Sequence, residues 1–163
     1  MKEIYLLANN PNTQFPLQEL NNSIVCHFNK AIFRKQVNDT NTHYLMLNSF
    51  TKPHGNGGYF TPDEKNLYNN HYFVCSWTKQ FNSDPWKKIR EDFIPHTLVI
   101  TYQYGDDYPK GKFRSVGYSA LKYFNTTFDK INLVGFTFSG WHGHDWEFEK
   151  NYAMNNKKLN IIL

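Results

Sequence analysis

Seven apolar runs of strand length recur along this chain of 163 residues, and they constrain its fold more than any other feature of the sequence. Within each run the apolar residues are nearly continuous and do not alternate with polar ones. Such runs are typical of strands that are buried on both faces, as in a parallel sheet. The predicted strands cover residues 3–9, 23–29, 43–50, 71–77, 96–102, 131–138 and 158–163.

The segments between these runs carry helix and loop signals. Pro16 suits the first turn of a helix, Ser83-Asp84 with Pro85 is a helix start signal, and Asp145 is a plausible N-cap. Strands separated by helices predict an α/β class: a Rossmann-like, mostly parallel sheet with helices on both faces, in a single domain over 1–163. Helices are predicted over residues 16–22, 83–93, 115–128 and 145–156, and a loop over 52–60.

The net charge of +4 is scattered over the chain and not gathered in one run. No basic stretch reaches the length of a nucleic-acid arm, so no nucleic-acid partner is expected. A modest basic surface fits an anionic ligand or a peripheral contact with an acidic membrane surface, and solvation alone explains it equally well.

The two cysteines, Cys26 and Cys75, each lie inside an apolar run. Their spacing matches neither a disulfide framework nor a zinc pattern, so we expect two buried thiols in a reducing compartment. The first residues, MKEIYLLANN, are too briefly apolar for a signal peptide, and no segment approaches the length of a membrane span. We therefore expect a soluble, cytoplasmic protein.

Ligands of open α/β sheets bind beyond the carboxyl ends of the strands. In this chain that rule selects Asn9-Asn10-Pro11, Asn29, Ser49, the segment 102–107 and the stretch GFTFSGWHGHDWEFEK over 135–150. We expect these segments to converge on one crevice.

Two of these regions suit a nucleotide. Asn9 and Asn10 end the first predicted strand, where their amides could hold a phosphate or a ribose, although an ordinary turn explains them too. Ser115 stands at a helix N-cap position and Gly117 permits close backbone approach, so the helix amides could bind an anion. A plain helix cap is the alternative.

The stretch 135–150 is dense in ionisable and aromatic side chains. His144 precedes a predicted helix and Glu149 follows five residues later, so His144 is a candidate general base. Two alternatives remain open: a structural aromatic turn, or a metal site. The candidate metal ligands are His142, His144, Asp145, Glu147 and Glu149.

Taken in order, three stretches resemble the sialyltransferases, both the animal-type family with its L, S, III and VS motifs and the bacterial enzymes of similar organisation. IYLLANNPNTQFPLQELNNSIVCHFNKA (4–31) is similar to the large motif, with Asn9-Asn10-Pro11 where bacterial members have Asn-Gly-Pro. RSVGYSALKYFNTTFDKINLVGFTF (114–138) is similar to the small motif, and HDWEFEKN (144–151) to the VS motif. The resemblance covers about half of the chain.

This resemblance implies a metal-independent, inverting glycosyltransferase with no cofactor, in which a CMP-sugar is the donor substrate and a glycan the acceptor. The sugar would be sialic acid or a related keto-sugar acid, as in polysaccharide biosynthesis. By position, Asn9, Asn10 and Asn29 would contact the nucleotide, and Ser115 and Gly117 would lie near the donor phosphate or carboxylate. His144 and Glu149 would be the catalytic pair.

The chain also departs from the family pattern. Val116 stands where a hydroxyl residue is common, and only five residues separate Phe138 from His144. The acceptor site would then be reduced, built from loops 51–70 and 102–113, or completed by a partner such as a second copy of the chain. Two alternative functions follow: a non-catalytic nucleotide- or glycan-binding domain of the same fold, or a metal-dependent hydrolase using His142, His144 and Glu149.

Overall fold

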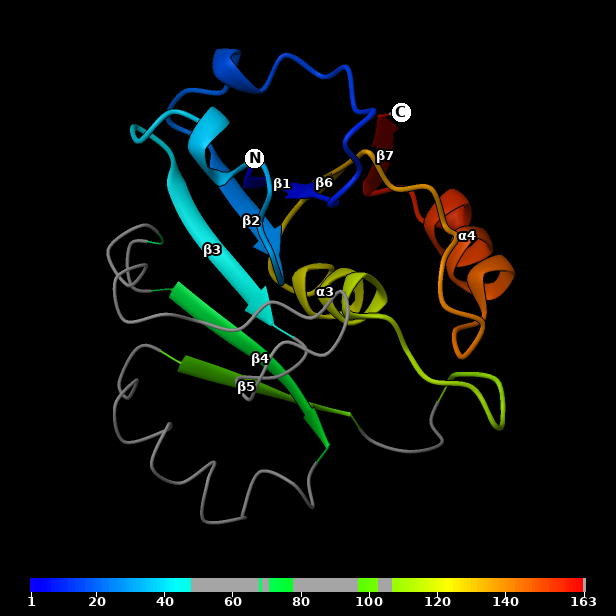
Figure 1. The fold of residues 1–163 in the computed structure, drawn as a ribbon. Helices are drawn as coiled ribbons and strands as arrows, with labels where there is room; N and C mark the ends of the chain where they lie inside the picture. The colour runs from blue at the N-terminus through cyan, green and yellow to red at the C-terminus, as the bar shows by residue number, and fades with distance from the viewer. Residues whose placement is uncertain (48–67, 69–70, 78–96, 103–106, 163) are drawn as a thin grey trace.

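Seven parallel strands form one sheet at the centre of the protein. The computed structural model describes residues 1–47, 68, 71–77, 97–102 and 107–162. The strands lie in the order β5-β4-β3-β2-β1-β6-β7 (Figure 1), and every pairing is parallel. They are β1 (Glu3–Leu7), β2 (Ile24–Phe28), β3 (Thr42–Leu47), β4 (His71–Trp77), β5 (Thr97–Tyr102), β6 (Lys130–Val134) and β7 (Leu159–Ile162). The predicted α/β fold with a parallel sheet is confirmed.

The order of the strands reverses direction at β1. Strands β2 to β5 extend the sheet on one side of β1, whereas β6 and β7 extend it on the other. Ile4 accordingly pairs with Ile24 on one side and with Ile131 on the other. Such a reversal is a topological switch point, and in this class of fold the ligand crevice lies there, beyond the carboxyl ends of the strands.

The two faces of the sheet are covered differently. Helices α3 (Val116–Phe124) and α4 (Trp146–Asn155) cover one face, where Leu121, Phe124 and Ala153 pack against β1, β2, β3 and β6 (Figure 1). The short 3-10 helices η1 (Leu17–Glu19) and η2 (Arg34–Gln36) neighbour the second core, on the other face. Alternate residues of β1 supply the two cores, since Ile4 and Leu6 belong to the first and Leu7 to the second.

Two predicted helices are confirmed and one is reduced. Ser115 and Asp145 are the N-caps of α3 and α4, and their side chains accept hydrogen bonds from the backbone N–H groups of Tyr118 and Phe148. The helix predicted over 16–22 is only the single turn of η1, because the chain turns into an extended conformation at Leu20. The predicted helix 83–93 and loop 52–60 lie outside the described residues.

Two strands end two or more residues earlier than predicted. The strand predicted over 3–9 ends at Leu7, and the strand predicted over 131–138 ends at Val134. In the second case Gly135 follows with a φ of 72°, a conformation that leaves the strand region. Polar residues and the aromatic stretch therefore begin right at the carboxyl edge of the sheet.

Cys26 is fully buried in β2, as predicted for a buried thiol, while the side chain of Cys75 lies outside the described residues. In the described part of the chain, no helix combines the length and the apolar character that crossing a bilayer requires.

A pair of buried histidines lies between β2 and β3. His27 Nε2 lies 3.1 Å from His43 Nδ1, and His43 Nε2 lies 3.1 Å from the carbonyl oxygen of Asn38. Because that carbonyl can only accept, His43 carries its proton on Nε2 and accepts the N–H of His27 on Nδ1. Burial, the neighbouring histidine and Arg34 lower the pKa of His27 from 6.5 to about 3. Burial and Arg34 also lower the pKa of His43.

We predict that this pair makes the protein sensitive to acid. Between pH 6.5 and about 3 the imidazole of His27 is protonated in the unfolded chain and neutral in the folded chain. The free energy of unfolding should therefore fall as the pH drops below 6.5, by up to about 1.4 kcal/mol per pH unit. Urea denaturation at pH 7 and pH 5 measures this. The variant His27→Gln keeps a donor for His43 and should have a shallower pH dependence, whereas His142→Gln, at an exposed histidine, should match the wild type. Identical slopes for His27→Gln and wild type would refute the prediction.

Candidate functional site

The segments that follow β1 and β6 pack against each other at the switch point. A Cβ atom on Gly135 would lie 2.1 Å from Thr13 Oγ1 and 3.4 Å from Asn10 Cβ, so only glycine fits there. Asn10 shapes its own turn, because its side-chain oxygen accepts the N–H of Asn12 and its carbonyl accepts the N–H of Thr13. Two of the five segments that were predicted to converge are therefore neighbours.

Asn9 ties the end of β1 to the end of β2. Its Nδ2 donates to the carbonyl oxygen of Phe28 at 2.8 Å, and its Oδ1 accepts the N–H of Ile32 at 3.2 Å. Asn29 follows Phe28 with a φ of 47°, and its N–H donates to the carbonyl oxygen of Met46 in β3. Asn9 and Asn29 thus lie at neighbouring strand ends, and the amide of Asn9 is used to hold the backbone together. Ser49 and residues 103–106 lie outside the described residues.

Gly117 allows an aromatic ring to approach the first turn of α3. A Cβ atom at this position would lie 2.9 Å from Cε1 of Phe136, which is closer than van der Waals contact permits. Phe136 follows β6, and its ring also packs edge-on against Phe28 at the end of β2. The close approach predicted at Gly117 is present, and its partner in this structure is a phenyl ring.

The carboxylate of Glu149 is bound at the N-terminus of α3. Glu149 is only 2 % exposed. Its Oε2 accepts the hydroxyl of Ser115 at 2.6 Å, and its Oε1 accepts both the N–H of Ser115 at 2.9 Å and the hydroxyl of Tyr108 at 2.7 Å. Both donors of Ser115 are therefore directed to Glu149, at the place where an anionic ligand was predicted.

Burial and hydrogen bonding act on Glu149 in opposite directions. Burial raises the pKa of the carboxyl group above its ordinary value and outweighs the donors of Ser115 and Tyr108, which lower it. Tyr108 completes the connection to α4, since its oxygen accepts the N–H of Asp145 at 2.9 Å. Burial and the bond to Glu149 raise the pKa of Tyr108 above its ordinary value, so this hydroxyl stays protonated as a donor. The ring of Tyr108 packs among Tyr118 and Phe148.

His144 is held in one orientation just before α4. Its Nδ1 lies 2.6 Å from the carbonyl oxygen of Phe113. That carbonyl is an acceptor, so the neutral ring carries its proton on Nδ1 and its Nε2 presents a lone pair. Within the described residues, no hydrogen-bond partner is found for Nε2. This is the arrangement expected of a general base.

Aromatic side chains surround His144. Trp141 and Trp146 meet its ring edge-on, with centroid distances of 5.0 Å and 4.9 Å. Trp146 Nε1 donates to the carbonyl oxygen of Trp141, which closes the turn that carries the histidine. Phe113 lies in the predicted acceptor loop 102–113 and Trp141 in the stretch 135–150, but neither was predicted individually. Their signal would have been two bulky aromatic residues in glycine-rich turns, where no core position is expected.

The metal cluster considered as an alternative is not assembled in the part of the chain that the structure describes, where no three His, Cys, Asp or Glu side chains are grouped to hold a metal ion. His142 is exposed, and Glu149 faces Ser115 and Tyr108.

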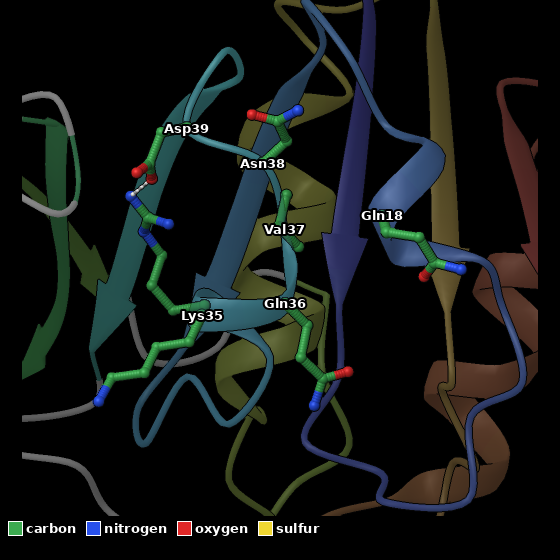
Figure 2. A pocket seen from close by; sticks show the side chains of 7 residues that line it. Gln18, Lys35, Gln36, Val37, Asn38 and Asp39 are labelled. Carbon is green, nitrogen blue, oxygen red and sulfur yellow. Dashed lines mark hydrogen bonds and ion pairs between the residues drawn. The ribbon is translucent and has the colours of Figure 1, made fainter.

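A pocket of about 480 Å³ lies apart from this site (Figure 2). Its walls come from η1, η2 and the turn that follows η2, and its guanidinium group is paired, since Arg34 Nη2 lies 2.8 Å from Asp39 Oδ1. None of the predicted site residues lines it. The lining residues are Gln18, Arg34, Lys35, Gln36, Val37, Asn38 and Asp39.

Comparisons with protein-family models, with curated proteins and with solved structures give no match for this chain.

We predict that Glu149 is essential for stability. In Glu149→Ala, three donors of Ser115 and Tyr108 lose their acceptor in a buried site, so the free energy of unfolding should fall by about 2–4 kcal/mol. Urea denaturation measures this. The matched control is Glu147→Ala, an exposed carboxylate in the same helical turn, which should cost less than about 1 kcal/mol. Equal losses in the two variants would contradict the structural role of Glu149.

Proposed function

We propose that this chain is a glycosyltransferase resembling sialyltransferases, which moves sialic acid or a related keto-sugar acid from a CMP-sugar donor to a glycan with inversion. One observation carries the proposal: His144 is fixed through Nδ1 on a backbone carbonyl, with Nε2 directed away from that bond. The donor class comes from the resemblance of the three ordered motifs. The all-parallel sheet with its switch point supports a nucleotide site.

In the proposed reaction, an acceptor hydroxyl attacks the anomeric carbon of the donor as the bond to CMP breaks. Nε2 of His144 takes the hydroxyl proton, and the imidazolium that forms keeps its Nδ1–H on the carbonyl of Phe113. CMP leaves with the bonding electron pair, so no oxidant, reductant or metal is needed. The nucleotide lies over the carboxyl ends of β1 and β2, near Asn10 and Asn29.

Glu149, Ser115 and Gly117 take different roles in this proposal from those predicted. Glu149 and Ser115 act as positioning residues, because their mutual bonds connect α3 to α4 and so set the place of the turn that carries His144. Gly117 gives room to Phe136 and so fixes the loop after β6. The donor phosphate must then find other partners than Ser115.

The bonding of Ser115 to Glu149 favours a second candidate function, a nucleotide- or glycan-binding domain that is not an enzyme. If the donors of Ser115 are permanently occupied by Glu149, the fold can bind a nucleotide or a glycan without transferring a sugar. The two candidates differ in one property, the release of CMP from a CMP-sugar.

We predict selective binding of CMP. Calorimetric titration should give at least about tenfold tighter binding of CMP than of UMP or UDP, which corresponds to about 1.4 kcal/mol. Asn29→Gly removes the side chain while glycine accepts the φ of 47°, and it should weaken CMP binding about tenfold or more. Asn22→Gly makes the same change at a φ of 52°, before the amino end of β2, and should bind CMP as the wild type does. Absence of binding to any of the three nucleotides would reject the donor assignment.

We predict that His144 is required for transfer and not for binding. Asn in His144→Asn can keep the hydrogen bond to Phe113 but has no group at the position of Nε2. CMP release from CMP-sialic acid should fall by about 10²-fold or more, with CMP affinity within about threefold of wild type. His142→Asn is the matched control and should keep full activity. Normal CMP binding with no CMP release in the wild type would instead support the non-catalytic candidate.

A further inference from the structure

Two exposed aromatic rings lie together beside His144. The described residues expose five large apolar side chains, and of these only Phe113, 37 % exposed, and Trp141, 54 % exposed, contact each other in a ring pair. Their centroids are 5.7 Å apart and their planes are inclined by 28°, so they are stacked. We call this pair the aromatic platform.

The platform is held in place by the turns that carry it. The ring of Trp141 lies over Gly143, where a Cβ atom would come within 2.2 Å of it. The N–H of Phe113 donates to the carbonyl oxygen of Gly143 at 2.9 Å, and Lys112 Nζ donates to the carbonyl oxygen of His142 at 2.9 Å. An exposed ring that is already ordered loses little conformational entropy when a ligand stacks on it.

Both platform residues contact the proposed base directly. Trp141 meets the His144 ring at 5.0 Å, and the carbonyl of Phe113 accepts its Nδ1–H. A ligand ring lying on the platform therefore has its edge close to the side chain of His144. The site offers an apolar surface and a hydrogen-bond acceptor next to each other.

We propose that the aromatic platform binds the pyranose ring of the acceptor glycan, an inference that rests on the function proposed above. A pyranose has an apolar face of C–H groups and a rim of hydroxyls, so its face suits the outer side of the stacked pair, where Trp141 is the more exposed ring, while one hydroxyl reaches Nε2 of His144. A protein partner fits less well, because two side chains bordered by Lys112 and His142 fall far below the roughly 1,000 Å² of a stable protein interface.

The test labels the protein with 5-fluorotryptophan and follows its ¹⁹F spectrum, with the Trp141 signal assigned from Trp141→Phe. Methyl β-galactopyranoside, methyl β-N-acetylglucosaminide and methyl α-mannopyranoside are titrated separately, without nucleotide. We expect at least one glycoside to shift the Trp141 signal saturably. The Trp141 variants lack this signal, so their binding of the same glycoside is measured by calorimetric titration beside the wild type. Trp141→Ala should weaken that binding about tenfold, as expected for the loss of a stacked ring, while Trp141→Phe keeps most of it. Met154→Ala, at an exposed apolar side chain of α4, is the control and should bind as the wild type does.

The outcomes separate this inference from the proposed function. If the protein binds CMP but no glycoside shifts the Trp141 signal, the platform is refuted while the donor assignment stands. If CMP itself shifts that signal and the glycosides do not, the platform serves the donor and the inference is also overturned. If no nucleotide binds but a glycoside shifts Trp141, the proposed function fails and glycan binding at the platform remains. With an active enzyme, Trp141→Ala should raise the KM for the acceptor about tenfold and leave CMP affinity unchanged.

Discussion

Every strand of this sheet points in the same direction, so each connection must cross one of its faces before the next strand begins. In the described part of the chain, the connections that carry η1 and η2 pack on one face, and α3 and α4 pack on the other. All carboxyl ends consequently meet at one edge, with the ends of β1 and β6 side by side at the point where the order reverses. Asn9, Asn10 and Phe136 lie at these strand ends because of this single constraint.

The buried carboxylate of Glu149 fixes the relative positions of the segments around His144. It joins the start of α3 to the first turn of α4 and, through Tyr108, to the segment that leads to Phe113. His144 is oriented by the turn that carries it and by the carbonyl of Phe113. The same network holds both of these. A buried charge is costly unless every acceptor is used, and three donors satisfy this one. The geometry of the base and the stability of the fold thus depend on the same group.

Much of the fold could be predicted because each strand corresponds to a short apolar run in the sequence. All seven runs form strands. The caps Ser115 and Asp145 were predictable for a similar reason, since capping is a local property of the chain. The strand order and the partner of Glu149 could not be predicted, because both depend on contacts between residues that are distant in the sequence. His144 and Glu149 are near in sequence, yet one faces the carbonyl of Phe113 and the other is buried against Ser115. The side chain of Asn9 was predicted to bind a ligand, and its bonds to Phe28 and Ile32 could be seen only once β1 and β2 were placed together.

The position of β1 between β2 and β6 has a consequence for folding. The contact between Lys2 and Asp129 joins residues that are 127 positions apart, and the pairing of β1 with β6 closes a similar loop. Long-range pairing of this kind slows folding, because the entropy of loop closure is lost before the contacts are gained. During synthesis one edge of β1, an interior strand of the sheet, has no partner until β6 leaves the ribosome. A chain interrupted before residue 130 would expose this edge to other chains, so aggregation of nascent protein is the expected result of truncation there.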